Sequence, residues 1–405
     1  MTDASKLRAW YAHRQGLEGS LEGESSAEVL ERAGWARSVG GVSPYLALFS
    51  RAAITREQAD ADAAKLEIYE LPAARGCTYV LPASDFALGL AAGQGFQGEI
   101  KTAARLGVTE KEIDKLCEAI VVALEKDKGP LDPDLLREAA GKAVRNLGPE
   151  GKKKGLSTTL PVALEKLQAT GEIRRVPTNG RFDQQRYQYA LWRPNPLRSF
   201  KLAPEQVAIE LARRYFGWIG PASVSGFQTF SGLGVKATKA ALDPLRLEPV
   251  ETGHSDQRDQ RFFLPGDRSK FDAFKPPKEP HYSLLGSIDS VFELRNQFQE
   301  SLDPKDLARQ VLVDSGMKNL GSLTMLPSHA ILDRGRLIGL WEYDQATESV
   351  AWVSFVKKDR ALQEAVTRTE NFVRDQLGDA RSFGLDSPKS RAPRIQALRK
   401  AAASA

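Results

Sequence analysis

The sequence predicts an α+β fold that is mainly α-helical, and two observations carry this prediction. A unit of about 60 residues occurs three times before residue 276, each time as a helix, a turn, a second helix and two short strands. Beyond residue 276 apolar residues alternate with polar ones, as they do in an antiparallel sheet. The chain of 405 residues is long enough to hold several such units, each with its own core.

The unit over residues 131–192 shows the pattern most clearly. Asp132 and Pro133 are suited to the start of a helix, and a second helix, capped by a hydroxyl residue in 157–159, ends at Gly171. Two alternating segments follow, with Asn179-Gly180 as the turn between them. Helix, turn, helix and hairpin in this order form a winged helix, whose second helix enters the major groove of DNA.

Residues 203–264 and 26–82 repeat this plan. In the later copy Gly232 and Gly234 lie between two short helices, and a hairpin with a polar tip is expected over 247–265. These glycines lack the spacing of a phosphate-binding loop, so we interpret them as a bend between helices. In the earlier copy Ser43 is expected to cap a helix whose first residue is Pro44.

The C-terminal part is expected to begin with a linker over residues 274–282. A small antiparallel sheet follows, in which Asp333-Arg334-Gly335 forms a hairpin turn, and a helix spans about 359–377. The tail over 387–400 is basic and interrupted by proline, so we expect it to lie over the surface or against DNA. We therefore divide the chain into a first winged helix with an N-terminal extension (1–100), a second (101–198), a third (199–275) and a C-terminal β-rich region (276–405).

Positive charge is concentrated in the second unit. Residues 142–198 contain twelve lysines and arginines and four carboxylates, a net charge of +8, although the whole chain carries +5. Such a focus suits a phosphate backbone, because each neutralised phosphate releases counterions, but a solvated lysine-rich surface is an equal alternative.

Several classes of protein are excluded by composition. No apolar run approaches the roughly 20 residues of a membrane span, and the N-terminus lacks the apolar segment of a signal peptide. Cys77 and Cys117 indicate no disulfide framework, and four scattered histidines indicate no zinc site. We expect a cytoplasmic, nucleoid-associated protein without metal or cofactor.

The chain resembles the tandem winged-helix DNA glycosylases of the AlkZ/YcaQ type. The resemblance runs through "GWARSVGGVSPYLALFSRA", "ELPAARGCTYVLPASD", the basic second unit and "HAILDRGRLIGLWEYD". It implies three winged helices curved into a C around double-stranded DNA, and hydrolysis of the N-glycosidic bond of a flipped bulky or modified base. Three different winged helices in one polypeptide, without a coiled-coil seam, favour a monomer that wraps one DNA site.

The sequence departs from this family at two places. The resemblance implies a Gln-Xaa-Gln or Gln-Xaa-Asp motif just after the turn Gly40-Gly41-Val42, where this chain has Ser43-Pro44-Tyr45. It also implies a histidine where the segment 75–79 ends in Tyr79. A chain without these groups either uses a carboxylate elsewhere or performs no chemistry.

The candidate residues follow from these departures. For catalysis we consider the polar groups of the C-terminal sheet: His329, Asp333, Glu342 and Asp344. Asp60 and Asp62 are second candidates, and Asp85 is expected to be a helix cap. For each of these, an ordinary structural role is the competing interpretation.

Two further groups of candidate residues are expected to bind the flipped base and the DNA backbone. A pocket for the flipped base is expected from Ser43, Tyr45, Arg75, Tyr79, Trp341 and Tyr343. DNA contacts are expected from Lys152, Lys153, Lys154, Thr158, Arg174, Arg175, Arg181, Arg186, Arg334, Arg391 and Arg394. The alternative to a glycosylase is a non-catalytic regulator that kept the scaffold, although regulators usually bind as dimers.

Overall fold

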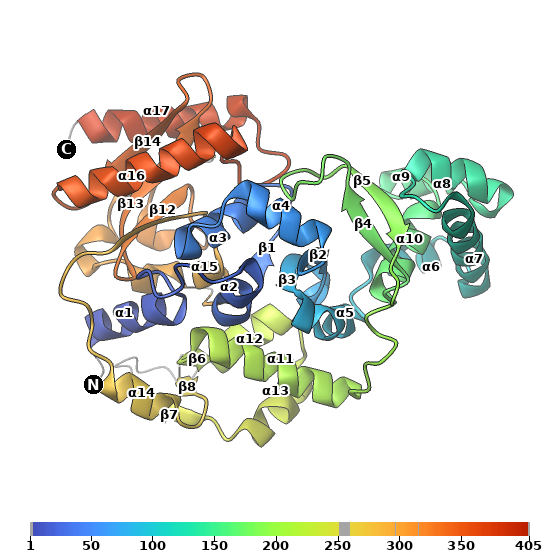
Figure 1. Ribbon diagram of the computed structural model, residues 1–405, viewed down its shortest axis with the longest axis horizontal. Coiled ribbons are helices and arrows are strands. Elements are labelled where there is room, and N and C mark those ends of the chain that lie inside the picture. The colour runs from blue at the N-terminus through green and yellow to red at the C-terminus, as the bar shows by residue number, and fades with distance from the viewer. Residues whose placement is uncertain (1–2, 251–259, 296, 315, 404–405) are drawn as a thin grey trace.

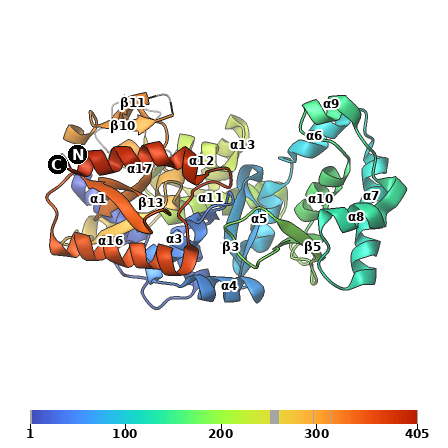
Figure 2. The ribbon, with the colours of Figure 1, turned by 90° about the horizontal axis from the view of Figure 1, so that it is seen from above.

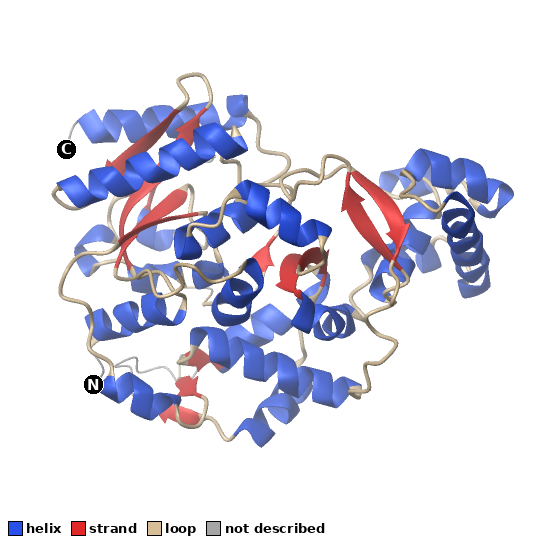
Figure 3. Cartoon of the chain, viewed as in Figure 1, coloured by secondary structure: helices blue, strands red, loops and turns tan. Residues whose placement is uncertain are grey.

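The computed structural model describes residues 3–250, 260–295, 297–314 and 316–403. The fold is mixed and mainly helical, with several small sheets distributed through it (Figure 3). Figure 1 shows residues of the second unit as a lobe at one end of the long axis, whereas the other parts pack together at the opposite end. Figure 2 shows the same separation from above.

The N-terminal part builds a three-stranded sheet among five helices. Capping boxes at Ser25 and Thr55 begin α2 and α4, because each side chain and the residue three positions later satisfy free backbone amides. The elements are α1 (Ala4–Arg14), α2 (Ser26–Ala33), β1 (Ala36–Arg37), α3 (Ser43–Ala52), α4 (Arg56–Ala64), β2 (Ile68–Pro72), β3 (Thr78–Pro82) and α5 (Phe86–Gly93).

The register of this sheet places polar groups on both of its faces. The strand order is β1-β3-β2, with Arg37 opposite Tyr79 and Glu70 opposite Val80. Because side chains alternate along a strand, Arg37 and Tyr79 lie on one face and Glu70 on the other.

The expected cap at Ser43 is not found. Val42 precedes α3, Ser43 is its first residue and Pro44 its second, and no side chain caps the helix. The Oγ of Ser43 is buried and has no hydrogen-bond partner among the described residues.

The second unit has a hydrophobic core of its own, formed by residues 103–173. Asp132 caps α8 as expected, and Gly171 follows α10 with a φ of 69°. The elements are α6 (Gly98–Arg105), α7 (Glu110–Asp127), α8 (Pro133–Ala140), α9 (Gly148–Lys153), α10 (Leu160–Ala169), β4 (Ile173–Pro177) and β5 (Tyr187–Leu191).

The connection between β4 and β5 is longer than the expected turn at Asn179-Gly180. Thr178 pairs with Arg186, so residues 179–185 form a loop, which we call the arm. The arm is held away from the hairpin because Phe182 is 2% exposed and its ring lies 5.7 Å from that of Tyr45 in α3. A tertiary contact, not the local turn preference, decides this conformation.

The third unit packs directly below the N-terminal sheet (Figure 1). Gly232, with a φ of 72°, ends α12, and Gly234 precedes α13, so the expected bend between two helices is confirmed. The expected hairpin tip falls on residues 251–259 and lies outside the described residues. The elements are α11 (Pro204–Ile219), β6 (Ala222–Ser223), α12 (Val224–Ser231), α13 (Val235–Leu242), β7 (Glu248–Val250), β8 (Arg261–Phe263) and α14 (Asp267–Ala273).

The C-terminal part contains the expected sheet, in the order β14-β13-β12-β9. Arg334 and Gly335 adopt positive φ values in the expected hairpin turn. The elements are β9 (Tyr282–Leu285), α15 (Ser290–Glu293), β10 (Gln310–Val313), β11 (Gly316–Asn319), β12 (His329–Asp333), β13 (Arg336–Asp344), β14 (Ser349–Ser354), α16 (Arg360–Phe372) and α17 (Pro388–Ala403).

Proline does not interrupt the C-terminal tail as expected. Residues 388–403 form a helix, α17, which packs on β13 and β14. Arg391, Ile395 and Leu398 are buried at helical spacing, and Pro393 is accommodated near the helix start. No helix in the described part of the chain is long and apolar enough to span a membrane.

Candidate active site

The C-terminal sheet holds His329 in a fully structural set of contacts. The backbone N–H of Ser287 donates to Nδ1 over 3.0 Å, and Nε2 donates to the carbonyl of Ala380 over 2.5 Å. The ring lies 4.4 Å from that of Trp341, and burial lowers the pKa of His329. With both nitrogens engaged by backbone, this imidazole is poorly placed to transfer a proton to a ligand.

The carboxylates of this sheet are each paired with an arginine. Glu342 is 2% exposed and accepts from Arg394 over 3.2 Å. Asp333 accepts two hydrogen bonds from Arg334, from Nε to Oδ1 over 2.9 Å and from Nη2 to Oδ2 over 2.8 Å.

Asp344 and the two aromatic residues are similarly engaged. Asp344 lies 2.8 Å from Arg399 and accepts from the backbone of Ala346. Trp341 and Tyr343 are 0% and 2% exposed, so neither presents a ring face for a base to stack on.

The turn Gly40-Gly41-Val42 is covered by a distant segment. A Cβ on Gly41 would lie 2.2 Å from the carbonyl oxygen of Ser382, so only glycine fits below residues 381–382. Arg381 donates to the carbonyls of Gly40 and Asp183, which fastens the same segment to the arm. The structure therefore closes the place where the resemblance implies the catalytic motif.

Tyr45 ties this turn to Asp60 and the arm. Its hydroxyl donates to Oδ1 of Asp60 over 2.5 Å and accepts from the N–H of Phe182 over 2.9 Å. Burial is the largest cause of the raised pKa of Tyr45 and of Asp60. Arg56 also lies 2.7 Å from Asp60, whereas Asp62 accepts from Ser26, so these second candidates are engaged as well.

A different cluster lies on the Tyr79 face of the N-terminal sheet. The guanidinium of Arg37 donates to the carbonyl of Thr78 over 2.9 Å and lies 5.2 Å from the centre of the Tyr79 ring. Burial raises the pKa of Tyr79. Two of the expected pocket residues, Tyr79 and Arg75, belong to this cluster, whereas Ser43, Tyr45, Trp341 and Tyr343 do not.

Arg75 occupies an unusual backbone conformation at the β2–β3 turn. Its φ of 57° is in the left-handed region, which costs a non-glycine residue about 1 kcal/mol and is common at functional sites. Its Nη1 donates to the carbonyl of Thr229 in α12 over 3.0 Å. A Cβ on Gly232 would lie 2.9 Å from its side chain, so the third unit holds Arg75 in place.

Glu293, at the end of α15, supplies the carboxyl group of this cluster. It is half-buried, and burial raises its pKa against the opposing charges of Arg37 and Arg75. Its carboxyl group makes no hydrogen bond or ion pair within the described part of the chain, so its oxygens are available to a ligand or water. We call Arg37, Arg75, Tyr79 and Glu293 the sheet-face cluster.

Sequence reasoning missed Glu293 because no local pattern marks it. The segment over 287–295 carries no motif, and its neighbours come from positions more than 200 residues earlier. The one local signal that could mark this segment is the helix start at Asp289-Ser290, where Asp289 accepts from the N–H of Val291.

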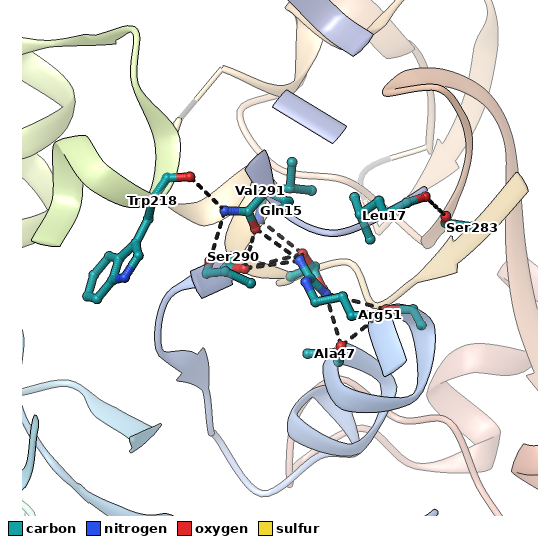
Figure 4. Close-up of polar contacts among 11 residues, drawn as sticks. Gln15, Leu17, Ala47, Arg51, Trp218, Ser283, Ser290 and Val291 are labelled. Carbon is teal, nitrogen blue, oxygen red and sulfur yellow. Dashed lines mark hydrogen bonds and ion pairs between the residues drawn. The ribbon is translucent and has the colours of Figure 1, made fainter. Parts of the chain in front are cut away.

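A buried polar network fixes α15 and hence Glu293. Arg51, in α3, donates to both oxygens of Asp289 over 2.7 and 2.8 Å and to Oε1 of Gln15 over 3.0 Å (Figure 4). Ser290 donates to the same oxygen of Gln15. The amide nitrogen of Gln15 donates in turn to the carbonyl of Trp218. Four separate segments therefore meet at the start of this helix.

The opposite face of the sheet carries a second buried carboxylate. Ser38 donates to Oε1 of Glu70, which is 4% exposed, and Oε2 has no hydrogen-bond partner among the described residues. Arg175 lies 3.9 Å from this oxygen and donates to Thr78 over 3.2 Å. This cluster joins the N-terminal sheet to the second unit.

The arginines expected to contact DNA divide into two sets. Arg174 donates to the hydroxyl of Tyr69, and Arg181 binds Asp183 and the carbonyl of Leu377. With Arg175, they therefore connect the hairpin and its arm to other parts of the protein. Arg186 remains exposed.

The remaining expected DNA contacts also differ in exposure. Lys152, Lys153 and Lys154 are exposed, and Thr158 is half-buried. Arg391 is 1% exposed and lies 2.6 Å from Asp379. The exposed members are therefore concentrated around α9.

Asp85 does not act as the expected helix cap. It precedes α5 but makes no side-chain cap bond. Its oxygens instead accept from the indole nitrogen of Trp35 over 2.9 Å and from Arg214.

Comparison with known proteins assigns the chain to a family. A family model described as DNA glycosylase AlkZ-like matches residues 41–382. Among solved structures, the chain is similar to Streptomyces sahachiroi DNA glycosylase AlkZ, with a TM-score of 0.67 and 21% identity over 94% of this chain and 98% of that chain. At this identity the likeness concerns the fold. The chain matches none of the curated proteins compared with it.

Proposed function

Because the chain belongs to the AlkZ-like DNA glycosylase family, we propose that it hydrolyses the N-glycosidic bond of a bulky, alkylated or otherwise modified base in duplex DNA. The product is an abasic site. The family match over residues 41–382 is the observation that carries this proposal.

We also propose the arrangement that brings DNA to the site. Three tandem winged helices, over 1–100, 101–198 and 199–275, curve into a C around the duplex, and the C-terminal region over 276–405 completes the scaffold. The order of helices and hairpins in each part supports this arrangement. Lys152, Lys153 and Lys154 on α9 contact phosphates, and the protein acts as a monomer in the cytoplasm, associated with the nucleoid.

We place the reacting carboxylate at Glu293. Asp333, Glu342 and Asp344 are each paired with an arginine, whereas Glu293 makes no ion pair or hydrogen bond within the described residues. A carboxylate near the sugar stabilises the positive charge that develops as the bond to the base breaks. The half-buried position of Glu293 strengthens that interaction, because less water screens it.

The proposed reaction consumes one water molecule. With the nucleotide flipped out of the duplex, ionised Glu293 orients this water and accepts its proton while the water oxygen bonds to C1′. The bond between C1′ and the base nitrogen breaks, and its electron pair leaves with the base. Arg37, which lies over the buried ring of Tyr79, forms the wall against which the flipped nucleotide lies.

A non-catalytic DNA-binding role is the second candidate. It is favoured by the covered Gly40-Gly41-Val42 turn, which is followed by neither glutamine nor carboxylate. Incubation with duplexes that carry different modified bases, followed by alkaline cleavage at abasic sites, separates the two functions. Strand cleavage supports the glycosylase, and DNA binding without any abasic site supports the regulator.

A further inference from the structure

A basic pocket lies between α1, α2, α11 and α14, outside the sheet-face cluster. Its volume is about 720 Å³, within the range of cavities that hold small organic ligands. The pocket is open to solvent, and the helices that line it belong to different parts of the chain. None of its lining residues takes part in the proposed reaction.

Cations dominate the wall of this pocket. Arg14, Arg32, Arg213, Arg214 and Lys270 line it, and Glu31 is the one carboxylate among the described lining residues. Four of these cations also pair with carboxylates outside the lining: Arg14 and Lys270 with Asp267, Arg214 with Asp85, and Arg213 with Glu210. A concave surface lined by one sign of charge concentrates ions of the opposite sign. The wall therefore suits an anion with several negative charges.

Buried carboxylates hold two of these arginines from behind. Asp85 is 1% exposed and binds Nε and Nη2 of Arg214 over 3.1 and 2.9 Å. Asp267 is 6% exposed and lies 3.3 Å from Arg14 and 2.9 Å from Lys270. These pairs fix the cations in position and leave N–H groups for a ligand, as in a preorganised phosphate site.

The guanidinium of Arg32 is available to bind a ligand. It is exposed, and it makes no hydrogen bond or ion pair with any described residue. Its charge also contributes to the lowered pKa of Arg14, although burial is the larger cause. An anion between Arg32 and Arg14 would relieve this repulsion.

Aromatic rings complete the wall beside the cations. The rings of His13 and Phe274 are stacked 5.0 Å apart, and the Phe274 ring lies 5.4 Å from that of Trp10. Planar aromatic groups stack on such rings, and a nucleotide joins a planar base of this kind to a phosphate.

We propose that this pocket binds a nucleotide, with its phosphate on Arg32, Arg213 and Arg214 and its base against Phe274. The nucleotide is either free or one unit of a DNA strand that passes the pocket. The Asp85–Trp35 hydrogen bond links the pocket to the sheet-face cluster, because Trp35 packs 6.0 Å from Tyr79.

Calorimetric titration of the full chain tests the proposal, with thymidine 5′-monophosphate and the single-stranded tetranucleotide d(T)4 as probes. The variant is Arg32→Ala with Arg213→Ala, since Arg32 is unpaired and Arg213 is 53% exposed beside Glu210. The matched control is Arg137→Ala with Arg360→Ala, two arginines in exposed ion pairs elsewhere. Unchanged melting temperatures verify folding of both double variants.

We expect the wild type to bind a probe and the pocket variant to bind it at least about tenfold more weakly, because charge-assisted hydrogen bonds to the phosphate are removed. The control changes affinity by less than about twofold. Tighter binding of the mononucleotide assigns a free nucleotide, and tighter binding of d(T)4 assigns a DNA strand. The proposal is overturned if neither probe binds, or if the control loses as much affinity as the pocket variant.

Discussion

The guanidinium of Arg51 binds both carboxylate oxygens of Asp289, although 238 residues separate them in the sequence. Both side chains are 1% exposed. Asp289 caps α15, whose last residue is Glu293, so this ion pair sets the position of the proposed reacting carboxylate. Arg51 is therefore a positioning residue.

Replacing Arg51 by alanine tests this relationship. The change leaves the Asp289 carboxylate buried without its partner, which costs about 3–5 kcal/mol of unfolding free energy. Urea denaturation measures the loss, and Arg360→Ala, in an exposed pair, is the control with a loss below about 1 kcal/mol. A loss as small as that of the control would show that the network does not fix α15.

The pH dependence of stability tests the environment of Glu293. Burial raises the pKa of Glu293 in the folded protein, so the unfolded chain releases this proton at lower pH than the folded chain does. The contribution of Glu293 to stability is therefore full at low pH and is lost as the pH rises through the folded-state pKa.

Unfolding free energies measured by urea between about pH 4 and pH 8 check this sign. Glu293→Gln should remove this component of the pH dependence, whereas the exposed control Glu364→Gln should retain it. A wild-type curve that matches Glu293→Gln at every pH would contradict the assignment.

Removing the hydroxyl of Tyr45 tests whether its hydrogen bonds hold the arm in place. Tyr45→Phe leaves Oδ1 of Asp60 and the N–H of Phe182 without this partner, while Arg56 still binds Oδ2 of Asp60, and the loss costs about 1–3 kcal/mol. Hydrogen exchange over residues 178–186 should accelerate, because the arm is no longer hydrogen-bonded to α3. Tyr282→Phe removes an exposed bond to Asp359 and should leave this exchange unchanged. Unaltered exchange in Tyr45→Phe would mean that packing alone holds the arm.

Replacing exposed lysines of α9 tests whether this helix contacts the DNA backbone. Lys152→Ala with Lys154→Ala should weaken duplex binding for all sequences and reduce the salt dependence of log K by about 0.9 for each phosphate that the protein no longer neutralises. Lys357→Ala, an exposed lysine of the C-terminal part, is the control. Weaker binding confined to particular sequences would mean that this surface reads bases.

Local signals in the sequence predicted most helices and turns of the fold. Contacts between segments far apart in the sequence decided the conformations that local signals did not predict. The cap at Asp132 and the bend at Gly232 needed only neighbouring residues. The arm could not be predicted, because Phe182 packs on Tyr45, 137 positions earlier. The helix over 388–403 was missed because Pro393 was interpreted as a breaker.

The sequence indicated less of the proposed site. Tyr79 and Arg75 were candidates because they belong to the segment that resembles the family. Glu293 was not, since it carries no local motif and its position depends on Arg51. The polar residues of the C-terminal sheet are engaged by Arg334, by arginines of α17 and, for His329, by backbone groups, which no alternating pattern could reveal.

Base excision by the wild type and by Glu293→Gln tests the central claim most directly. Single-turnover reactions on duplexes with alkylated or bulky bases, followed by alkaline cleavage, measure abasic-site formation. We expect abasic sites with the wild type and at least about 100-fold slower formation with Glu293→Gln at unchanged DNA affinity. Full activity of Glu293→Gln would place the reacting group elsewhere. The absence of abasic sites on every substrate, with duplex binding intact, would contradict the glycosylase itself.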